Sequence, residues 1–241
     1  ANAVALYFLL PESLSAEHRS QAARNVSLKE VLARSGNWQF MAVIATWFFA
    51  TVPFAMLTAT FALFATERFR FEAAEIGFIF AYLGLLGAVI QGGLIGRLVS
   101  LFGDKALVVA GTAIMAASMM LLPVSETLVI LMAACTGIAV GNSLIMPTLN
   151  GLASKSVGAA WQGRALGVLQ SAASLARIIG PVLGGVLLNL DAQRAATRYG
   201  RTPFWVGGAI MLIALAFSLT LHAPDVSQQG SALESQTQEE V

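Results

Sequence analysis

Aromatic, hydroxyl, amide and methionine side chains recur at helical spacing within long uncharged stretches of this sequence. In the stretch that begins near residue 35, the stripe consists of Trp47, Thr51, Phe54 and Thr58. In the stretch from 127 to 150, it consists of Cys135, Asn142, Met146 and Asn150. Residues at these intervals share one face of a helix. Such mixed faces predict a cavity that binds large, partly apolar molecules, although hydrogen-bonded helix packing would select similar residues.

A third stripe carries a charge, Arg177, inside the otherwise apolar stretch 164–190. Its members are Gly163, Gly167, Gln170, Ser174, Arg177, Pro181 and Gly184. Arg177 lies about thirteen residues from each end of the stretch, or ~20 Å at the helical rise. A charge at that depth costs ~2.5–3.5 kcal/mol, so we expect an inward position. Its partner would be a carboxylate outside this chain, a row of helix carbonyls or an anionic group of a substrate, and a fixed brace between helices is the alternative.

Little in the sequence points to catalysis. The carboxylates nearest the apolar stretches fall at their ends, at Glu75, Asp104, Glu126 and Asp191. No histidine accompanies Cys135, and the segment from Gly151 to Ser156 lacks the glycine that precedes the lysine of a phosphate loop. We therefore expect no enzyme, no cofactor and no metal. If the protein moves protons, we expect the titrating carboxylate to lie outside this chain.

Composition alone indicates an integral membrane protein. Of the 241 residues, 57% are hydrophobic and 11% are charged, with a mean hydropathy of +0.74. Soluble domains carry about 25% charged residues. The formal net charge of +1 gives no reason to expect a nucleic-acid partner, so the lipid bilayer is the expected surrounding.

Six apolar stretches are long enough for transmembrane helices of about 20 residues. They cover residues 35–66, 76–96, 106–122, 127–150, 164–190 and 204–221. The polarity of the first, fourth and fifth stretches, together with Gln91 in the second, predicts that these four line the interior. The organisation that we expect is the end of a preceding transmembrane helix at 1–10, a cytoplasmic connector at 11–36, a six-helix unit at 37–221 and a disordered cytoplasmic tail at 222–241. We infer a piece of a longer protein.

A glycine-framed, charged turn is predicted between the second and third stretches. The sequence from Gln91 reads Gln-Gly-Gly-Leu-Ile-Gly-Arg-Leu-Val-Ser-Leu-Phe-Gly-Asp-Lys105. Glycines permit close backbone approach, and charges suit the membrane interface. The residues that we expect to matter for conformation here are Gly93, Arg97, Gly103, Asp104 and Lys105. Four pairs, Gly92/Gly96, Gly137/Gly141, Gly163/Gly167 and Gly180/Gly184, also have the spacing of close helix contacts.

This turn is similar to the glycine-and-charge loop motif of the major facilitator superfamily, with Arg97 where an acid is usual. Two further segments carry the resemblance. Ile179-Gly-Pro-Val-Leu-Gly-Gly185, which follows Gln162-Gly-Arg-Ala-Leu-Gly167, resembles the Gly-Pro-x-x-Gly-Gly pattern of drug/proton antiporters, and Pro11-Glu-Ser-Leu14 looks like the end of the sixth helix in that family. The resemblance covers roughly residues 4–221.

The resemblance implies the C-terminal half of a tetracycline-exporter-like transporter, all-α, with six transmembrane helices arranged as two three-helix repeats. It implies a proton-coupled exporter of amphipathic, drug-like molecules in a cell membrane, such as the bacterial inner membrane, with an N-terminal half as partner. Gly180, Pro181 and Gly184 would belong to its conformational machinery. Transport of a metabolite by the same fold is one alternative, and a membrane protein that binds partners without transport is another.

Overall fold

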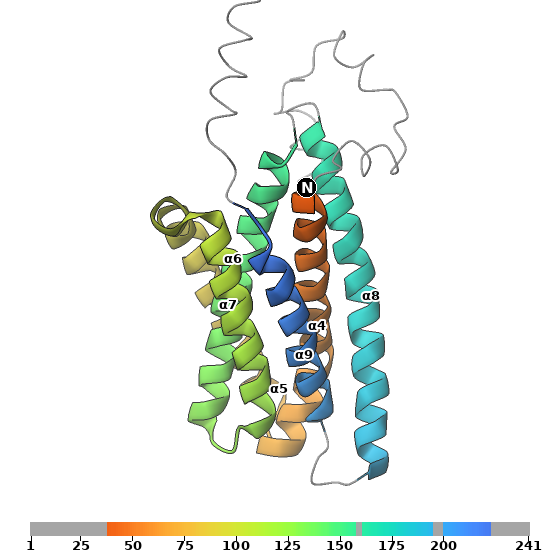
Figure 1. Cartoon of the computed structure of the whole chain (residues 1–241). Helices are drawn as coiled ribbons and strands as arrows, with labels where there is room; N and C mark the ends of the chain where they lie inside the picture. Colours follow the sequence, from red (N-terminus) through yellow and green to blue (C-terminus); the bar gives the residue numbers. More distant parts are fainter. Residues whose placement is uncertain (1–37, 158–160, 195–199, 223–241) are drawn as a thin grey trace, which may run out of the picture. The chain divides into compact units, whose positions relative to one another are not determined.

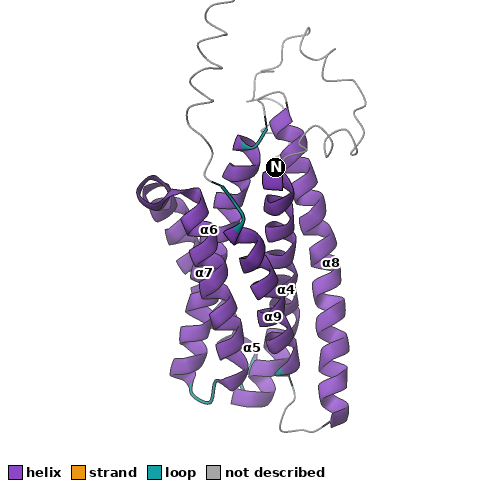
Figure 2. Ribbon diagram, in the orientation of Figure 1, coloured by secondary structure: helices purple, strands orange, loops and turns teal. Residues whose placement is uncertain are grey.

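The computed structural model describes residues 38–157, 161–194 and 200–222, and the regular secondary structure of these residues is helical (Figures 1 and 2). The helices are α4 (Trp38–Phe69), α5 (Ala73–Val89), the π-helix η1 (Ile90–Leu94), α6 (Ile95–Leu121), the 3-10 helix η2 (Leu122–Val124), α7 (Leu128–Lys155), α8 (Gln162–Arg194) and α9 (Thr202–Leu219). The predictions for residues 1–36, and those for the tail beyond His222, lie outside the described residues.

Among the described residues, five helical segments are long and apolar enough to cross a membrane, and one of them runs from Ala73 to Val124. This segment has 52 residues and would extend ~78 Å, more than twice the ~30 Å of a hydrocarbon core. Inside α6, Gly103 has φ 79° and ψ 160°, which breaks the helical geometry at a residue without a Cβ. The long segment is therefore kinked at Gly103.

The predicted loop at 97–105 is wrong in extent, because the chain is helical up to Phe102 and departs from helical geometry at Gly103 alone. The physical reason is packing. Leu98 and Val99 are partly buried against a cluster formed by Ile90, Leu107 and Leu144. Apolar contacts at these positions favour continuation of the helix, and the positive φ falls on the one residue type that adopts it readily.

Helix α4 packs against α8 and α9, while α6 packs against α7 and α9 and α5 contacts α7 (Figure 1). In the most apolar window of each segment, 67% of α4 is buried but only 28% of α8. Three prolines lie inside these helices, namely Pro53, Pro147 and Pro181. Helix α4 is thus an interior element, and α8 leaves most of its surface uncovered by the described residues.

Two of the four predicted glycine pairs make close helix contacts. A Cβ on Gly141 would lie 2.7 Å from the carbonyl oxygen of Gly111, and one on Gly180 would lie 2.7 Å from that of Val52. Gly137 and Gly184 meet side chains at similarly short distances. At Gly92/Gly96 and Gly163/Gly167 no described atom lies within 4 Å of an added Cβ, so close contact at these two pairs stays a prediction.

Polar contacts join the helix ends. Gln39 at the start of α4 donates from Nε2 to the carbonyl oxygen of His222 and accepts the His222 amide at Oε1, both at 2.8 Å. Asp191 in α8 accepts from the backbone amide and the hydroxyl of Thr202 at the start of α9. These hydrogen bonds tie together the ends of α4, α8 and α9.

Candidate functional site: a cavity between three helices

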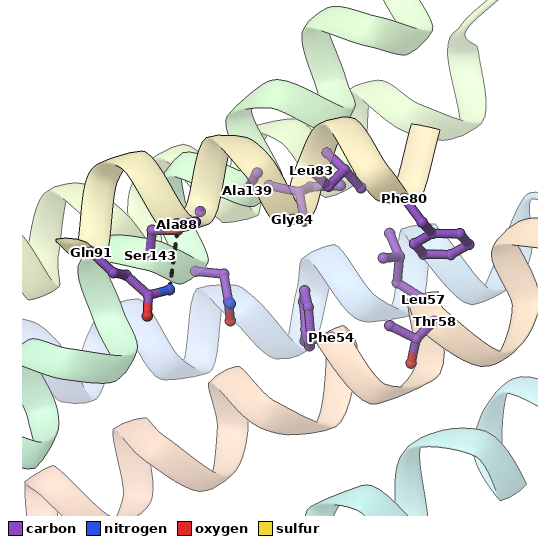
Figure 3. A pocket seen from close by; sticks show the side chains of 13 residues that line it. Phe54, Leu57, Thr58, Phe80, Leu83, Gly84, Ala88, Gln91, Ala139 and Ser143 are labelled. Carbon is purple, nitrogen blue, oxygen red and sulfur yellow. Dashed lines mark hydrogen bonds between the residues drawn. The ribbon is translucent and has the colours of Figure 1, made fainter. Parts of the chain in front are cut away.

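A cavity of about 430 Å³ lies between α4, the α5–η1 segment and α7 (Figure 3). Thirteen residues line it: Phe54, Leu57 and Thr58 from α4; Phe80, Leu83, Gly84, Gly87, Ala88 and Gln91 from α5 and η1; and Ile138, Ala139, Asn142 and Ser143 from α7. A space of this size is typical of the lower range of small-molecule sites.

The cavity is present because α5 turns small residues toward α4 and α7. Gly84, Gly87 and Ala88 lie within about one helical turn, and a Cβ added to Gly84 would meet no described atom within 4 Å. On the opposite side, Phe54 and Thr58 follow each other at i and i+4 along α4, which places both on one face. The space remains open because the small residues of α5 do not fill the gap beside the larger side chains of α4.

Polar groups gather where η1 meets α7. The Nε2 of Gln91 lies 3.5 Å from the hydroxyl oxygen of Ser143, a long hydrogen bond drawn in Figure 3. The Oδ1 of Asn142 is buried and has no hydrogen-bond partner among the described residues. Pro147 has no N–H to donate to the carbonyl of Ser143, its i−4 residue. This part of the cavity therefore holds acceptors that lack a donor among the described residues.

Apart from Thr58, the rest of the lining is apolar, and none of the thirteen lining residues is ionisable. The Thr58 hydroxyl donates to the Ala55 carbonyl oxygen at 2.9 Å, so it leaves only acceptor capacity. Such a lining can enclose an apolar body and hydrogen-bond a donor group at one end. It offers neither a nucleophile with a base nor a general acid.

Four of the ten predicted substrate-binding residues line this cavity: Phe54, Thr58, Gln91 and Asn142. Trp47 and Thr51 are buried in α4 outside the lining, where Thr51 donates to the Trp47 carbonyl oxygen at 2.7 Å. Met146 is partly buried in α7, and Gln170, Ser174 and Arg177 are exposed on α8. The structure thus brings together the predictions on α4, η1 and α7 but not those on α8, and a substrate-binding role remains a prediction for all ten.

Sequence reasoning missed most of the α5 contribution. Phe80, Gly84, Ala88 and Gln91 follow the i, i+4, i+8, i+11 spacing of one helical face, and this signal was available in the sequence. It was overlooked because glycine and alanine carry no chemistry, although their lack of side-chain volume is what opens the space.

The predicted conformational residues divide into two groups. Asp104, directly after the kink at Gly103, accepts a hydrogen bond from the Lys155 ammonium at 2.6 Å, and this ion pair joins α6 to the end of α7. Gly180 and Gly184 are buried against α4, beside the exposed Pro181. In contrast, Gly93 and Arg97 are exposed and Lys105 is partly buried, and no side-chain hydrogen bond or ion pair holds any of the three within the described part of the chain.

Comparison with known proteins agrees with this architecture. Residues 1–181 and 93–238 match the sequence profile of the Major Facilitator Superfamily. Multidrug resistance protein 2 of Bacillus subtilis (strain 168) is 28% identical over 225 residues, which are 90% of this chain and 53% of that protein. Tetracycline resistance protein, class D, of Salmonella ordonez is 29% identical over 191 residues, which are 76% of this chain and 46% of that protein.

A solved structure shares the fold. The crystal structure of the human organic anion transporter MFSD10 (TETRAN) matches with a TM-score of 0.63 and 20% identity, over 74% of this chain and 40% of that chain. The chain spans about half the length of the curated relatives that it matches. Because the family profile covers more than half of the sequence and five of the described helical segments are long and apolar enough to cross a bilayer, the chain belongs to the major facilitator superfamily and is a multi-pass membrane protein.

Proposed function

We propose that this chain is one half of a secondary active transporter that exports amphipathic, drug-like molecules, and that the cavity between α4, α5 and α7 lies on the substrate path. The cavity is the observation that carries the proposal. Phe54 lies near the middle of α4 and Asn142 near the middle of α7, which supports a position of the cavity near the bilayer midplane. Relatives named for multidrug and tetracycline resistance support the substrate class.

The chemistry of the lining fits an amphipathic ligand. Apolar contact area comes from Phe54, Leu57, Phe80 and Leu83. The Oδ1 of Asn142, which has no hydrogen-bond partner among the described residues, can accept a hydrogen bond from a ligand. A buried acceptor without a partner costs about 1–3 kcal/mol, and a ligand N–H or O–H would recover that free energy. An apolar body with a hydrogen-bond donor at one end would satisfy both parts of the site.

The proposed topology has six spans in two repeats of three helices, with an N-terminal half as partner. The 52-residue segment would then supply two spans that meet at the kink at Gly103. In a Cys135→Ser background, Ser100→Cys should react with a membrane-impermeant maleimide from one side, and Ala73→Cys and Val124→Cys from the other. Reaction of all three from one side would exclude the six-span arrangement.

Proton coupling is part of the proposal and rests on the resemblance to drug/proton antiporters. Its test uses inside-out membrane vesicles that contain the full-length protein, with N-phenyl-1-naphthylamine as the fluorescent amphipathic probe. Uptake should begin when an inside-acid gradient is imposed and stop when a protonophore collapses it. Uptake that survives the protonophore would remove the proton from the mechanism but leave transport in place.

The sharpest test of the cavity fills it. Gly84→Leu places a side chain in the open space, and Gly77→Leu is its matched control, because Gly77 lies on the same helix, is equally free of neighbours within 4 Å and does not line the cavity. We expect Gly84→Leu to reduce probe uptake per folded molecule at least about tenfold, since filling a site removes most of its binding energy. Gly77→Leu should transport normally. Equal uptake by the two variants would refute the proposal.

A further inference from the structure

Helix α8 carries two separate exposed stripes. The apolar stripe consists of Leu175, Ile178, Val182 and Val186, whose side chains are 53–65% exposed. The polar stripe consists of Gln170, Ser174, Arg177 and Pro181, all exposed and spaced i, i+4, i+7 and i+11. At 3.6 residues per turn, the residues of the apolar stripe are rotated around the helix from those of the polar stripe. The apolar stripe suits lipid or another apolar surface, whereas the polar stripe does not.

Arg177 is the residue on α8 that lipid cannot solvate. It lies fifteen residues after Gln162 and seventeen before Arg194, over ~20 Å from either end of the helix. Its side chain cannot reach the membrane surface over that distance. A charge held in hydrocarbon at this depth costs at least ~2.5–3.5 kcal/mol, so the guanidinium needs an anion or hydrogen-bond acceptors beside it.

The described residues supply no such anion. No hydrogen bond or ion pair joins Arg177 to another described residue. Asp191, the acid of the same helix, is fourteen residues away and accepts the Thr202 amide at 3.0 Å. Asp104 is occupied by Lys155. Within the described part of the chain, all N–H donors of the Arg177 guanidinium are therefore without an acceptor.

The surroundings of Arg177 are open and rich in hydrogen-bonding capacity. Ser174 and Pro181, within about one turn of Arg177 on the same face of α8, are exposed in the described structure. Ser174 donates to the Gln170 carbonyl at 2.9 Å and presents its lone pairs outward. Pro181 cannot donate to the carbonyl of Arg177, its i−4 residue, so an acceptor lies at the same level as the guanidinium. An uncovered face with hydrogen-bond acceptors beside the guanidinium favours a ligand that comes and goes over a close-packed brace.

We propose that Arg177 binds the anionic group of the transported molecule, so that the protein moves amphipathic acids such as carboxylates or sulfonates. This inference rests on the proposed transport function and adds the charge of the substrate. The guanidinium pairs with carboxylate or sulfonate oxygens through two parallel N–H donors, and the apolar part of the molecule is left to apolar side chains. A fixed carboxylate elsewhere in the protein is the competing source of the anion.

The test compares two dyes that differ in one group. 8-Anilinonaphthalene-1-sulfonate is an anion, and N-phenyl-1-naphthylamine is the same scaffold without the sulfonate. Uptake of each is measured in proteoliposomes that contain the full-length protein and is normalised to folded protein. The variants are Arg177→Gln, Arg177→Lys and, as a control arginine outside the span, Arg201→Gln.

Arg177→Gln should lower sulfonate uptake about tenfold or more, because a charge-assisted hydrogen bond is lost. It should change uptake of the neutral dye less than about twofold. Arg177→Lys should retain part of the sulfonate uptake because it keeps the charge without the planar fork, and Arg201→Gln should match the wild type. A measurement on the wild type keeps the test independent of variant folding: naphthalene-1-sulfonate should inhibit sulfonate uptake more strongly than 1-naphthalenemethanol, which lacks the anionic group.

Several results would overturn the inference. Equal loss of both dyes in Arg177→Gln would mean that a fixed carboxylate or brace holds the residue. Unchanged sulfonate uptake in that variant, or no inhibition by naphthalene-1-sulfonate, would remove the anion-binding role. Wild-type protein that carries the neutral dye but not the sulfonate would refute the anionic substrate and leave the proposed transport intact, whereas a wild type that carries neither would remove both.

Discussion

The glycines that hold α8 against α4 and those along α5 and η1 share a residue type but not an environment. At Gly180 a Cβ would lie 2.7 Å from the carbonyl oxygen of Val52 and 2.8 Å from the Ala55 Cβ, so backbone meets backbone. At Gly84, Gly92 and Gly93 no described atom lies within 4 Å. The first group lets two helices touch, while the second leaves space. Glycine therefore permits close helix packing between α4 and α8. Along α5 and η1 it leaves open space beside the cavity and in the π-helix.

The largest effect should come from bulk at the packed contact. Gly180→Leu forces apart α4 and α8, because the nearest atoms belong to backbone that cannot rotate away. Overpacking typically costs about 1–3 kcal/mol and more where backbone must move. We expect a large loss of folded protein, measured by size-exclusion chromatography of the detergent-solubilised protein and by its thermal unfolding midpoint.

The matched control for that prediction is Gly185→Leu, which lies on the same helix with nothing described within 4 Å. It should fold like the wild type. If Gly180→Leu and Gly185→Leu gave the same amount of folded protein, the distinction between packed and open glycines would be lost.

At the glycines without described neighbours, we expect an intermediate effect on the unfolding midpoint, in the stabilising direction. Glycine inside a helix costs about 0.5–1 kcal/mol relative to alanine, and at Gly92 in η1 no contact opposes the change. Gly92→Ala should therefore leave the unfolding midpoint unchanged or raise it slightly. A fall as large as that in Gly141→Ala, where the Cβ would meet the Gly111 carbonyl oxygen, would contradict the comparison.

The smallest effect should come from the ion pair at the end of the packed α6–α7 contact. Lys155 is 42% exposed, so water and salt weaken its attraction to Asp104. Lys155→Gln should lower the unfolding midpoint only slightly, and the difference from the wild type should shrink as salt is added. A loss comparable to that in Gly180→Leu would make this ion pair, and not helix contact, the main tie between the segments.

Helical periodicity predicted which residues share a face but not which neighbour that face meets. Phe54 and Thr58 on α4 and Asn142 on α7 were assigned to an interior and line one cavity. Gln170, Ser174 and Arg177 on α8 were assigned by the same reasoning, yet they are exposed in the described structure. A stripe fixes an angle around its own helix, and the partner depends on the crossing of all the other helices.

Glycine spacing had the same limit. Gly180/Gly184 and Gly163/Gly167 share the spacing i, i+4 on a single helix, but only the first pair touches another described element. Charges and glycines at 97–105 predicted a loop, whereas Leu98 and Val99 pack well enough to keep the chain helical up to the kink at Gly103. Glycines and charges therefore indicated the region of the bend, packing kept the preceding residues helical, and the bend itself falls on a glycine.

The central claim is that the transported molecule enters the cavity between α4, α5 and α7. In a Cys135→Ser background of the full-length protein, Thr58→Cys places a thiol on the lining, and Gly77→Cys places one on an exposed position of α5 outside it. The measurement is the alkylation rate of each thiol by N-ethylmaleimide, with and without N-phenyl-1-naphthylamine. The account predicts that the dye slows alkylation at position 58 and leaves the rate at position 77 unchanged. If the protein transports the dye but the rate at position 58 is the same with and without it, the claim is contradicted.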